Sequence, residues 1–179
     1  MGGSKAECVR RTIRDLVSFL DAQGGSDHSL RIHSFDHSVS ARLSAPSVRN
    51  MGKGVLEAAV SELAPRGGAN IELALREAKR VVDTIVLPVG EGVVHLLLTD
   101  GLPTHGETDL DKLTSLGPVG PHIRNACLGY GGGDCARMLG ALGRSGVDWS
   151  CGAGDSPEDA RRICAHLADN SDPSPKTLS

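Results

Sequence analysis

The chain has 179 residues, of which 39% are hydrophobic and 23% charged, a balance that suits one globular domain with its own core. Its formal net charge of −3 gives no general electrostatic reason to expect nucleic acid or an anionic membrane as the partner. Aromatic residues are only 2% of the chain, so platforms for stacking nucleic-acid bases are not expected.

Neither a membrane span nor a secretory signal is expected. No stretch approaches the roughly 20 apolar residues that a spanning helix needs, and residues 1–15 are polar and charged. The five cysteines form an odd set without a C-x-x-C pair, which favours buried thiols in a reducing compartment over disulfides or a metal site. We therefore expect an intracellular location, in the cytoplasm or the nucleus.

The first half of the chain predicts a helix, a hairpin and two further helices. Apolar spacing predicts an amphipathic first helix that Gly24 and Gly25 end. Residues 29–35 and 38–44 are expected to form strands, and their short connection predicts an antiparallel pair. Residues 51–63 are expected to form the next helix. The helix after it begins at its N-cap, Asn70, and its expected buried stripe consists of Ile71, Ala74, Leu75, Ala78, Val82 and Ile85.

The second half predicts strands that alternate with helices. Residues 93–98 are a continuous apolar run without polar alternation, which is typical of a central strand covered on both faces. Residues 123–128 and 147–151 are expected to form further strands, with a helix from 134 to about 142 between them. Such alternation predicts an α/β fold with a doubly wound, mostly parallel sheet, one antiparallel edge strand and helices on both faces.

The end of the chain predicts a last helix and a tail. Ser156 and Pro157 are expected at the N-cap and the first helical position of the last helix. Residues 170–179 are polar and rich in Pro and Ser, which predicts a disordered tail after a single domain at 1–169.

Asp100 stands where the most apolar strand ends. Ligands of open α/β sheets bind at the carboxyl ends of the strands, so this carboxylate is a candidate binding residue. The alternative is a turn in which the Asp100 side chain accepts hydrogen bonds from nearby backbone.

Five segments, taken in chain order, resemble a von Willebrand factor type A domain. They are RIHSFDHSVSARL, LAPRGGANIELALREA, VVHLLLTDGLPT, ACLGYGGGDCARMLGALGRSG and VDWSC with SPEDARRICAHLA. The resemblance implies a module that binds other proteins, often through Mg²⁺ held at the top of the sheet by oxygen ligands from three loops. The Asp of the third loop corresponds to Asp100.

The same resemblance indicates that the metal-ion-dependent adhesion site is degenerate. The first loop, Asp-x-Ser-x-Ser, would lie before residue 1, and Ala69 stands where the second loop has Thr. One of the expected ligands remains, so Asp100 is a relic metal position and no cofactor is expected. Mg²⁺ would bind only if an upstream segment restored the first loop.

The resemblance also places a first strand in the middle of the sheet, and this strand too would lie before residue 1. Its absence would leave two unpaired strand edges. We consider three explanations: a start further upstream, a strand donated by a partner or a second copy, and a poorly folded product of a truncated gene.

Other motifs do not support catalysis. The segment from Gly129 to Asp134 fails the G-x-G-x-x-G pattern, because Asp134 occupies the last glycine position. His105 and Glu107 are expected to be surface loop residues. The strand that ends in Asp100 faintly resembles dehalogenase-type phosphatases, but position 102 is Leu instead of the second Asp. A metal-dependent hydrolase or phosphatase that uses Asp100 remains the alternative function.

The sequence thus predicts a non-catalytic protein–protein interaction module of the von Willebrand type, whose partner is another protein and neither nucleic acid nor membrane. The expected binding surface is the rim formed by the strand carboxyl ends. Its candidate residues are Gly68, Asn70, Asp100, Thr104 and His105.

Overall fold

The structure is a computed structural model. It describes residues 3–22, 27–64, 67–144 and 149–153, together with Glu158, Arg161 and Ala165. The predicted last helix and the predicted tail lie almost entirely outside these described residues.

The first half of the described chain contains two helices and a hairpin. Helix α1 (Gly3–Ala22) leads into strands β1 (Leu30–Phe35) and β2 (Val39–Ala45), and helix α2 (Lys53–Ser61) follows. The two strands pair antiparallel, with an irregularity in register between Ile32 and His33. The predicted hairpin is therefore confirmed.

From Gly67 to Ala153, the described residues form three strands and three helices. Helix α3 (Ile71–Asp83) precedes strand β3 (Val93–Thr99), and the short helix α4 (Leu110–Thr114) precedes strand β4 (Ile123–Gly129). Helix α5 (Gly133–Arg144) then leads to strand β5 (Trp149–Ala153). Strands β3, β4 and β5 pair in parallel in that order.

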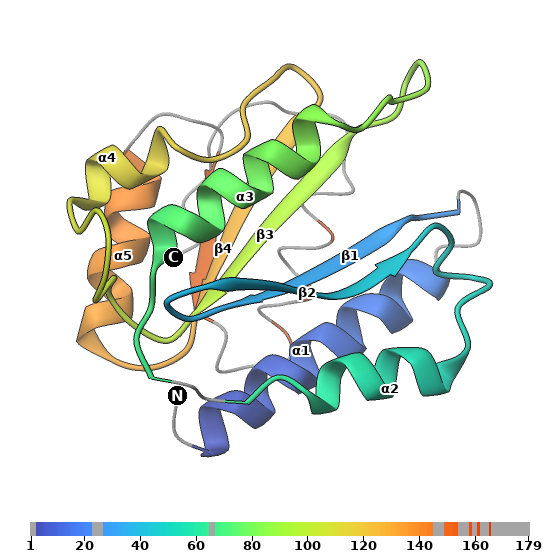
Figure 1. Ribbon diagram of the computed structural model, residues 1–179, viewed down its shortest axis with the longest axis horizontal. Helices are drawn as coiled ribbons and strands as arrows, with labels where there is room; N and C mark the ends of the chain where they lie inside the picture. Colours follow the sequence, from blue (N-terminus) through green and yellow to red (C-terminus); the bar gives the residue numbers. More distant parts are fainter. Residues whose placement is uncertain are drawn as a thin grey trace.

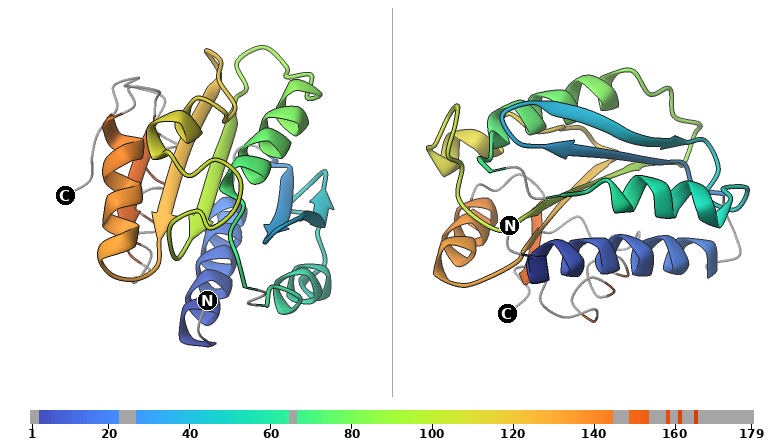
Figure 2. Two further views of the ribbon diagram at one scale, coloured as in Figure 1. Left: turned by 60° about the vertical axis from the view of Figure 1, so that its left-hand side comes forward. Right: turned by 60° about the horizontal axis from the view of Figure 1, so that its bottom comes forward.

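The strands form one layer between two layers of helices. Figure 1 shows α1 and α2 on one side of the strands, and Figure 2 shows α3, α4 and α5 on the other. The predicted α/β class is confirmed. Among the described residues, however, the strands form a two-stranded sheet β1-β2 and a separate three-stranded sheet β3-β4-β5 instead of one continuous sheet.

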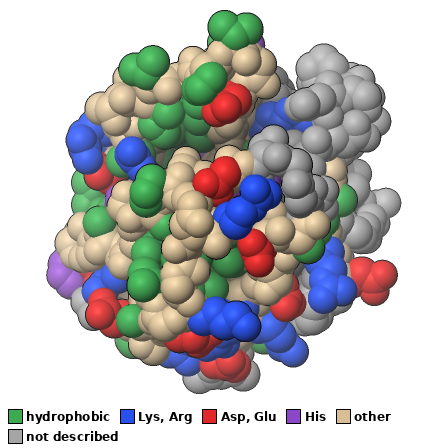
Figure 3. Space-filling view, turned by 90° about the vertical axis from the view of Figure 1, so that its right-hand side faces the viewer, with side chains coloured by type: hydrophobic (Ala, Val, Ile, Leu, Met, Phe, Trp, Pro, Cys, Tyr) green, Lys and Arg blue, Asp and Glu red, His purple; other side chains and the backbone are tan. Residues whose placement is uncertain are grey.

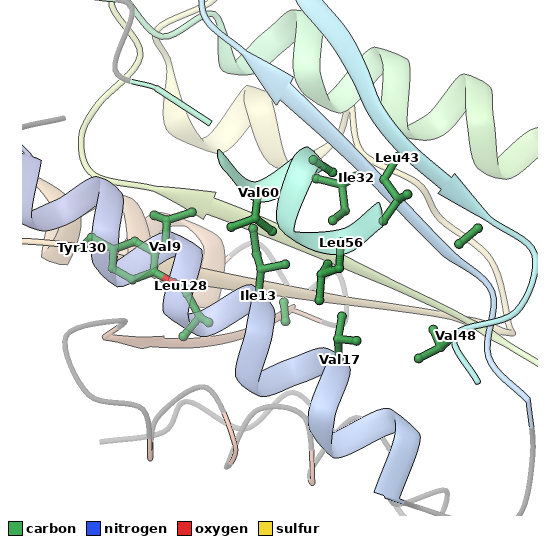
Figure 4. Close-up of a cluster of buried hydrophobic side chains, with 13 residues drawn as sticks. Val9, Ile13, Val17, Ile32, Leu43, Val48, Leu56, Val60, Leu128 and Tyr130 are labelled. Carbon is green, nitrogen blue, oxygen red and sulfur yellow. The ribbon is translucent and has the colours of Figure 1, made fainter. Parts of the chain in front are cut away.

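Two hydrophobic clusters fill the space between the layers. The first joins α1 and α2 to the strands, and Figure 4 shows Val9, Ile13 and Val17 of α1 within it. The second joins α3, α4 and α5 to the opposite face of the strands, with Leu75 and Leu113 almost fully buried. These clusters hold the strand ends that form the candidate site.

Three details differ from the sequence-based expectations. The apolar run predicted neighbours on both sides of strand β3, whereas among the described residues β3 pairs only with β4 and Val94 is 52% exposed. An unpaired edge at this strand agrees with what we expected if the first strand is missing. Of the stripe expected to be buried on α3, only Ile71 and Leu75 are buried. Helix α4 was not expected. Its N-cap, Asp109, accepts hydrogen bonds from the N–H groups of Asp111 and Lys112, which starts a helix too short to show apolar periodicity.

The described helices include none that is long and apolar enough to cross a membrane. The cysteine side chains that can be placed are free thiols, with Cys127 and Cys135 buried and Cys8 half-buried.

Candidate functional site

The carboxyl ends of β1 and β3 lie at one end of the strand layer, beside the N-termini of α1 and α3 (Figure 1). We call this end the rim. It includes the loop before α3 with Gly68–Asn70, the loop after β3 with Asp100–Glu107, and the turn after β4 with Tyr130–Gly132. The parallel direction of these strands brings segments that are distant in sequence to one surface.

Asn70 starts helix α3 and connects it to β1. Its side-chain oxygen accepts a hydrogen bond from the N–H of Leu73 at 2.9 Å, as expected of an N-cap. Its own N–H donates to the carbonyl oxygen of Asp36, just after β1, at 2.7 Å. Asn70 therefore fixes the start of α3 relative to the end of β1.

The two main loops of the rim are joined directly. The hydroxyl oxygen of Thr104 accepts a hydrogen bond from the N–H of Ala69 at 2.8 Å. In return, the carbonyl oxygen of Ala69 accepts hydrogen bonds from the N–H groups of Thr104, at 2.9 Å, and His105, at 3.3 Å. The ring nitrogen Nδ1 of His105 lies 3.0 Å from the same hydroxyl. The hydroxyl is thus engaged in holding the loops together.

Close approach at two glycines makes this junction possible. A Cβ atom at Gly68 would lie 2.5 Å from ring atoms of His105 and 2.9 Å from the hydroxyl of Thr104, so these two exposed side chains would have to move. Gly106 has a φ of +72°, and a Cβ there would lie 2.8 Å from the side-chain oxygen of Asn70. A side chain at Gly106 would be strained and would push against Asn70, whereas one at Gly68 would displace the ring of His105.

Two carboxylates stabilise the rim by accepting hydrogen bonds from backbone N–H groups. Glu72 accepts hydrogen bonds from the N–H of Glu107 at 2.8 Å and from Arg76 at 2.9 Å, and both lower the pKa of Glu72. Asp36 accepts from the N–H of Ser38 at 2.8 Å and from its hydroxyl at 3.0 Å, and these bonds lower the pKa of Asp36. Both carboxylates therefore stay charged at neutral pH and hold loops.

The carboxylate of Asp100 forms an ion pair with Lys5 of α1. The ammonium group of Lys5 is 3.9 Å from the carboxylate of Asp100, and the side chains are 42% and 25% exposed. Lys5 also lies against Gly131 after β4, where a Cβ atom would be 2.7 Å from the Lys5 ammonium nitrogen. A lysine side chain therefore spans the ends of β3 and β4.

The neighbourhood of Asp100 does not match the chemistry of a dedicated Mg²⁺ site. Mg²⁺ prefers octahedral oxygen ligands and gives up its water reluctantly. The ammonium group of Lys5, 3.9 Å from the carboxylate of Asp100, repels a cation. Ala69, at the position where the resemblance implies a Thr ligand, has no side-chain oxygen. Within the part of the chain that the structure describes, no group of three or more His, Cys, Asp or Glu residues could hold a metal ion.

A surface depression of about 630 Å³ lies between α4 and α5. Its walls carry mixed charge from Asp109, Asp111, Arg137 and Arg144, and none of the five candidate rim residues lines it. Because acidic, basic and apolar residues all line it, the depression favours no single class of ligand.

The structure brings together Gly68, Asn70, Thr104 and His105 through the contacts described above. Asp100 forms an ion pair with Lys5 of α1. Sequence reasoning did not identify Lys5, Glu72 or Gly106. Glu72 carried a usable signal as an acidic residue in the first turn of a helix, whereas no sequence pattern pointed to Lys5.

No protein-family model matches the sequence, and no curated protein does. Among solved structures, the fold resembles a von Willebrand factor type A protein from Catenulispora acidiphila, with a TM-score of 0.66 and 17% identity. That match covers 92% of this chain and 38% of the other.

Two other structures have similar folds. BatB from Bacteroides thetaiotaomicron has a TM-score of 0.62 and 16% identity, over 91% of this chain and 86% of that one. Proximal thread matrix protein 1 from the mussel byssus, with a zinc-occupied MIDAS motif, has a TM-score of 0.58 and 15% identity, over 92% of this chain and 42% of that one. The chain thus spans less than half of two of these proteins and most of the third. It has the von Willebrand factor type A fold.

Proposed function

We propose that this chain is a non-catalytic protein-interaction module that binds a partner protein through its rim. The observation that carries the proposal is the direct junction of the loops at Ala69 and Thr104, which fixes an exposed surface at the strand carboxyl ends. A surface that is ordered before binding loses less conformational entropy when a partner docks.

The chemistry of the rim supports binding over catalysis. The Thr104 hydroxyl and the His105 ring resemble a nucleophile paired with a base, but this hydroxyl already accepts a hydrogen bond from the N–H of Ala69. No carboxylate among the described residues bonds to the His105 ring to orient it, as a catalytic triad requires. The Asp100 carboxylate lies beside Lys5.

We further propose that partner binding does not require a metal ion. Lys5 supplies the positive charge beside Asp100 that a divalent cation would otherwise supply. A tethered ammonium group is present without any ion from solution. Binding through this rim should therefore persist in a chelator such as EDTA.

The test compares the same substitution at opposite ends of the molecule. His105→Glu changes the exposed rim, and His122→Glu changes an exposed histidine just before β4, at the amino end of the strands. Immobilised wild type and both variants are exposed to extract from the source cells, with and without EDTA. Retained proteins are then identified by mass spectrometry, and binding of each is measured with the purified protein.

The proposal expects a partner that wild type and His122→Glu bind with equal affinity in EDTA, and that His105→Glu binds at least about tenfold more weakly, a change of about 1.4 kcal/mol. Equal binding by both variants would refute a rim interface. Loss of wild-type binding in EDTA would refute metal independence. Turnover of a generic phosphoester that Asp100→Asn abolishes would restore the enzyme hypothesis.

A further inference from the structure

The strand layer is interrupted between β1 and β3. The two strands run in the same direction, from the end shown in Figure 3 toward the rim, as Figure 1 shows. Among the described residues they do not pair with each other, because β1 pairs only with β2, and β3 only with β4. The interruption therefore lies inside the layer, between two parallel edges.

The two strands that border this interruption contribute side chains to the same two hydrophobic clusters. On the α1 side, Ile32 of β1 shares a cluster with Leu96 and Leu98 of β3. On the α3 side, Phe35 of β1 shares a cluster with Leu97 of β3. The helices thus cover β1 and β3 as if they were members of one sheet, with apolar surroundings on both faces.

The hydrogen bonds at the two ends of β3 show which way its peptide groups point. The N–H of Val93 donates to His122 at 2.8 Å, and the carbonyl of Thr99 accepts from Tyr130 at 2.9 Å. Because peptide groups alternate in direction along a strand, those of Val93, His95, Leu97 and Thr99 face β4. The peptide groups of Val94, Leu96 and Leu98 therefore point away from β4, toward the interruption.

The same reasoning applies to β1. The N–H of Asp36 donates to the carbonyl of Ser38 at 2.9 Å in the hairpin, within the register that pairs Phe35 with Val39. Ser34 consequently faces β2, and the peptide groups of His33 and Phe35 face the interruption. Two rows of backbone donors and acceptors thus point toward each other, and no strand of the described residues lies between them.

The side chains of β3 are also those of a strand that has neighbours on both sides. Exposed edge strands usually carry charged residues or proline that discourage pairing. Strand β2 meets this expectation, since Ser40, Arg42 and Ser44 interrupt its apolar residues. Strand β3, Val-Val-His-Leu-Leu-Leu-Thr, has no such residue. Its Leu96 and Leu98 are half-buried, whereas β4 is buried from Asn125 to Gly129.

We propose that the interruption between β1 and β3 accepts an extended segment of a partner protein as an additional strand. The segment should be about as long as its neighbours, which have 6 and 7 residues. It should be apolar at consecutive positions, because both faces at this place are apolar. Backbone hydrogen bonds to Leu96, Leu98, His33 and Phe35 would supply affinity, as in other strand additions. This site is separate from the rim and does not depend on rim binding.

The test measures amide hydrogen exchange by NMR on the full chain, with and without a strand peptide. The probe is the capped peptide Lys-Ile-Val-Val-Leu-Val-Ile-Lys. The control is the same peptide with N-methyl groups on alternate backbone nitrogens, which keeps the side chains and removes hydrogen-bond donors. Exchange is followed for the amides of β3 at two protein concentrations.

The proposal expects an alternating pattern in the free protein. The amides of Val94, Leu96 and Leu98 should exchange at least about tenfold faster than those of His95 and Leu97, which bond to β4. Saturating probe peptide should slow the fast set about tenfold or more and leave the slow set unchanged, and the N-methylated peptide should have no effect.

Three outcomes would overturn the proposal. Equal protection of both sets in the free protein would mean that the β3 edge is already paired within the chain. Protection that grows with protein concentration would mean that a second copy fills the site. If the probe peptide leaves the exchange of the Leu96 and Leu98 amides unchanged, no strand is accepted. The same conclusion follows if the N-methylated peptide slows their exchange as much as the probe peptide does.

Discussion

Replacing Thr104 with Val tests whether the hydroxyl of Thr104 holds the rim together. Valine has nearly the same shape, so it should create no cavity and change no packing. It removes the acceptor for the N–H of Ala69, now at 2.8 Å, and the contact with the ring of His105, now at 3.0 Å. The two backbone bonds to the carbonyl of Ala69 remain.

The expected loss follows from the environment of Ala69. A hydrogen bond of this kind contributes about 1 kcal/mol net, and more when a buried donor is left without a partner. Ala69 is half-buried, so water can replace the hydroxyl in part. We expect the free energy of unfolding to fall by about 1 kcal/mol, which lowers the Tm of a domain of this size by about 2–4 °C.

Urea and thermal unfolding of Thr104→Val should be compared with Thr108→Val. Thr108 is an exposed threonine in the same loop, and no hydrogen bond from its hydroxyl is found among the described residues. The control measures the effect of exchanging a hydroxyl for a methyl group there. If both variants lose the same stability, the loop junction through Thr104 does not exist in solution and the ordered rim is wrong.

Further predictions concern the cap, the core and a buried histidine. Asn70→Ala should cost about 1 kcal/mol in urea unfolding, because the N–H of Leu73 loses its cap; Asn50→Ala, at an exposed turn, is the control and should cost far less. Leu75→Ala should cost about 2–5 kcal/mol, because Leu75 is 0% exposed in the second cluster, and a cost under 1 kcal/mol would contradict this packing. Burial lowers the pKa of His95, although its hydrogen bond with Asn125 opposes the shift. The unfolded chain therefore binds the proton more readily than the folded chain. The free energy of unfolding should be highest above about pH 6.5 and should decrease as the pH falls below that value. The same pH profile in His95→Gln would show that another group is responsible.

Much of the fold could be predicted because its signals are local. The N-cap at Asn70, the polar alternation of Val39, Ala41 and Leu43, and the apolar run of β4 each depend on neighbours in sequence. The rim junction could not be predicted in the same way. Ala69 and Thr104 meet only because β1 and β3 end at the same level of the layer, a relationship that no local pattern contains.

The ion pair of Lys5 with Asp100 is a second contact that sequence reasoning could not predict. In sequence it is one cation in the first turns of an amphipathic helix, where a solvent-exposed position is the usual interpretation. Its role depends on the packing of α1 across the strands, which brings its ammonium group to Asp100 and Gly131. Sequence reasoning could identify Asp100 as an anion at a strand end, but not the cation that accompanies it.

The composition of β3 predicts a strand with two neighbours, but among the described strands it pairs with only one. Seven residues without charge or proline indicate a strand with neighbours on both sides, yet the described sheet leaves it at an edge with Val94 exposed. An apolar edge with unused backbone groups is costly in water, since both its side chains and its peptide groups gain from a neighbour. At β3 the composition predicts two neighbouring strands and the observed position provides one, whereas composition and position agree for β2 and β4. An added strand between β1 and β3 would remove the conflict by supplying hydrogen bonds and apolar contacts at the same place.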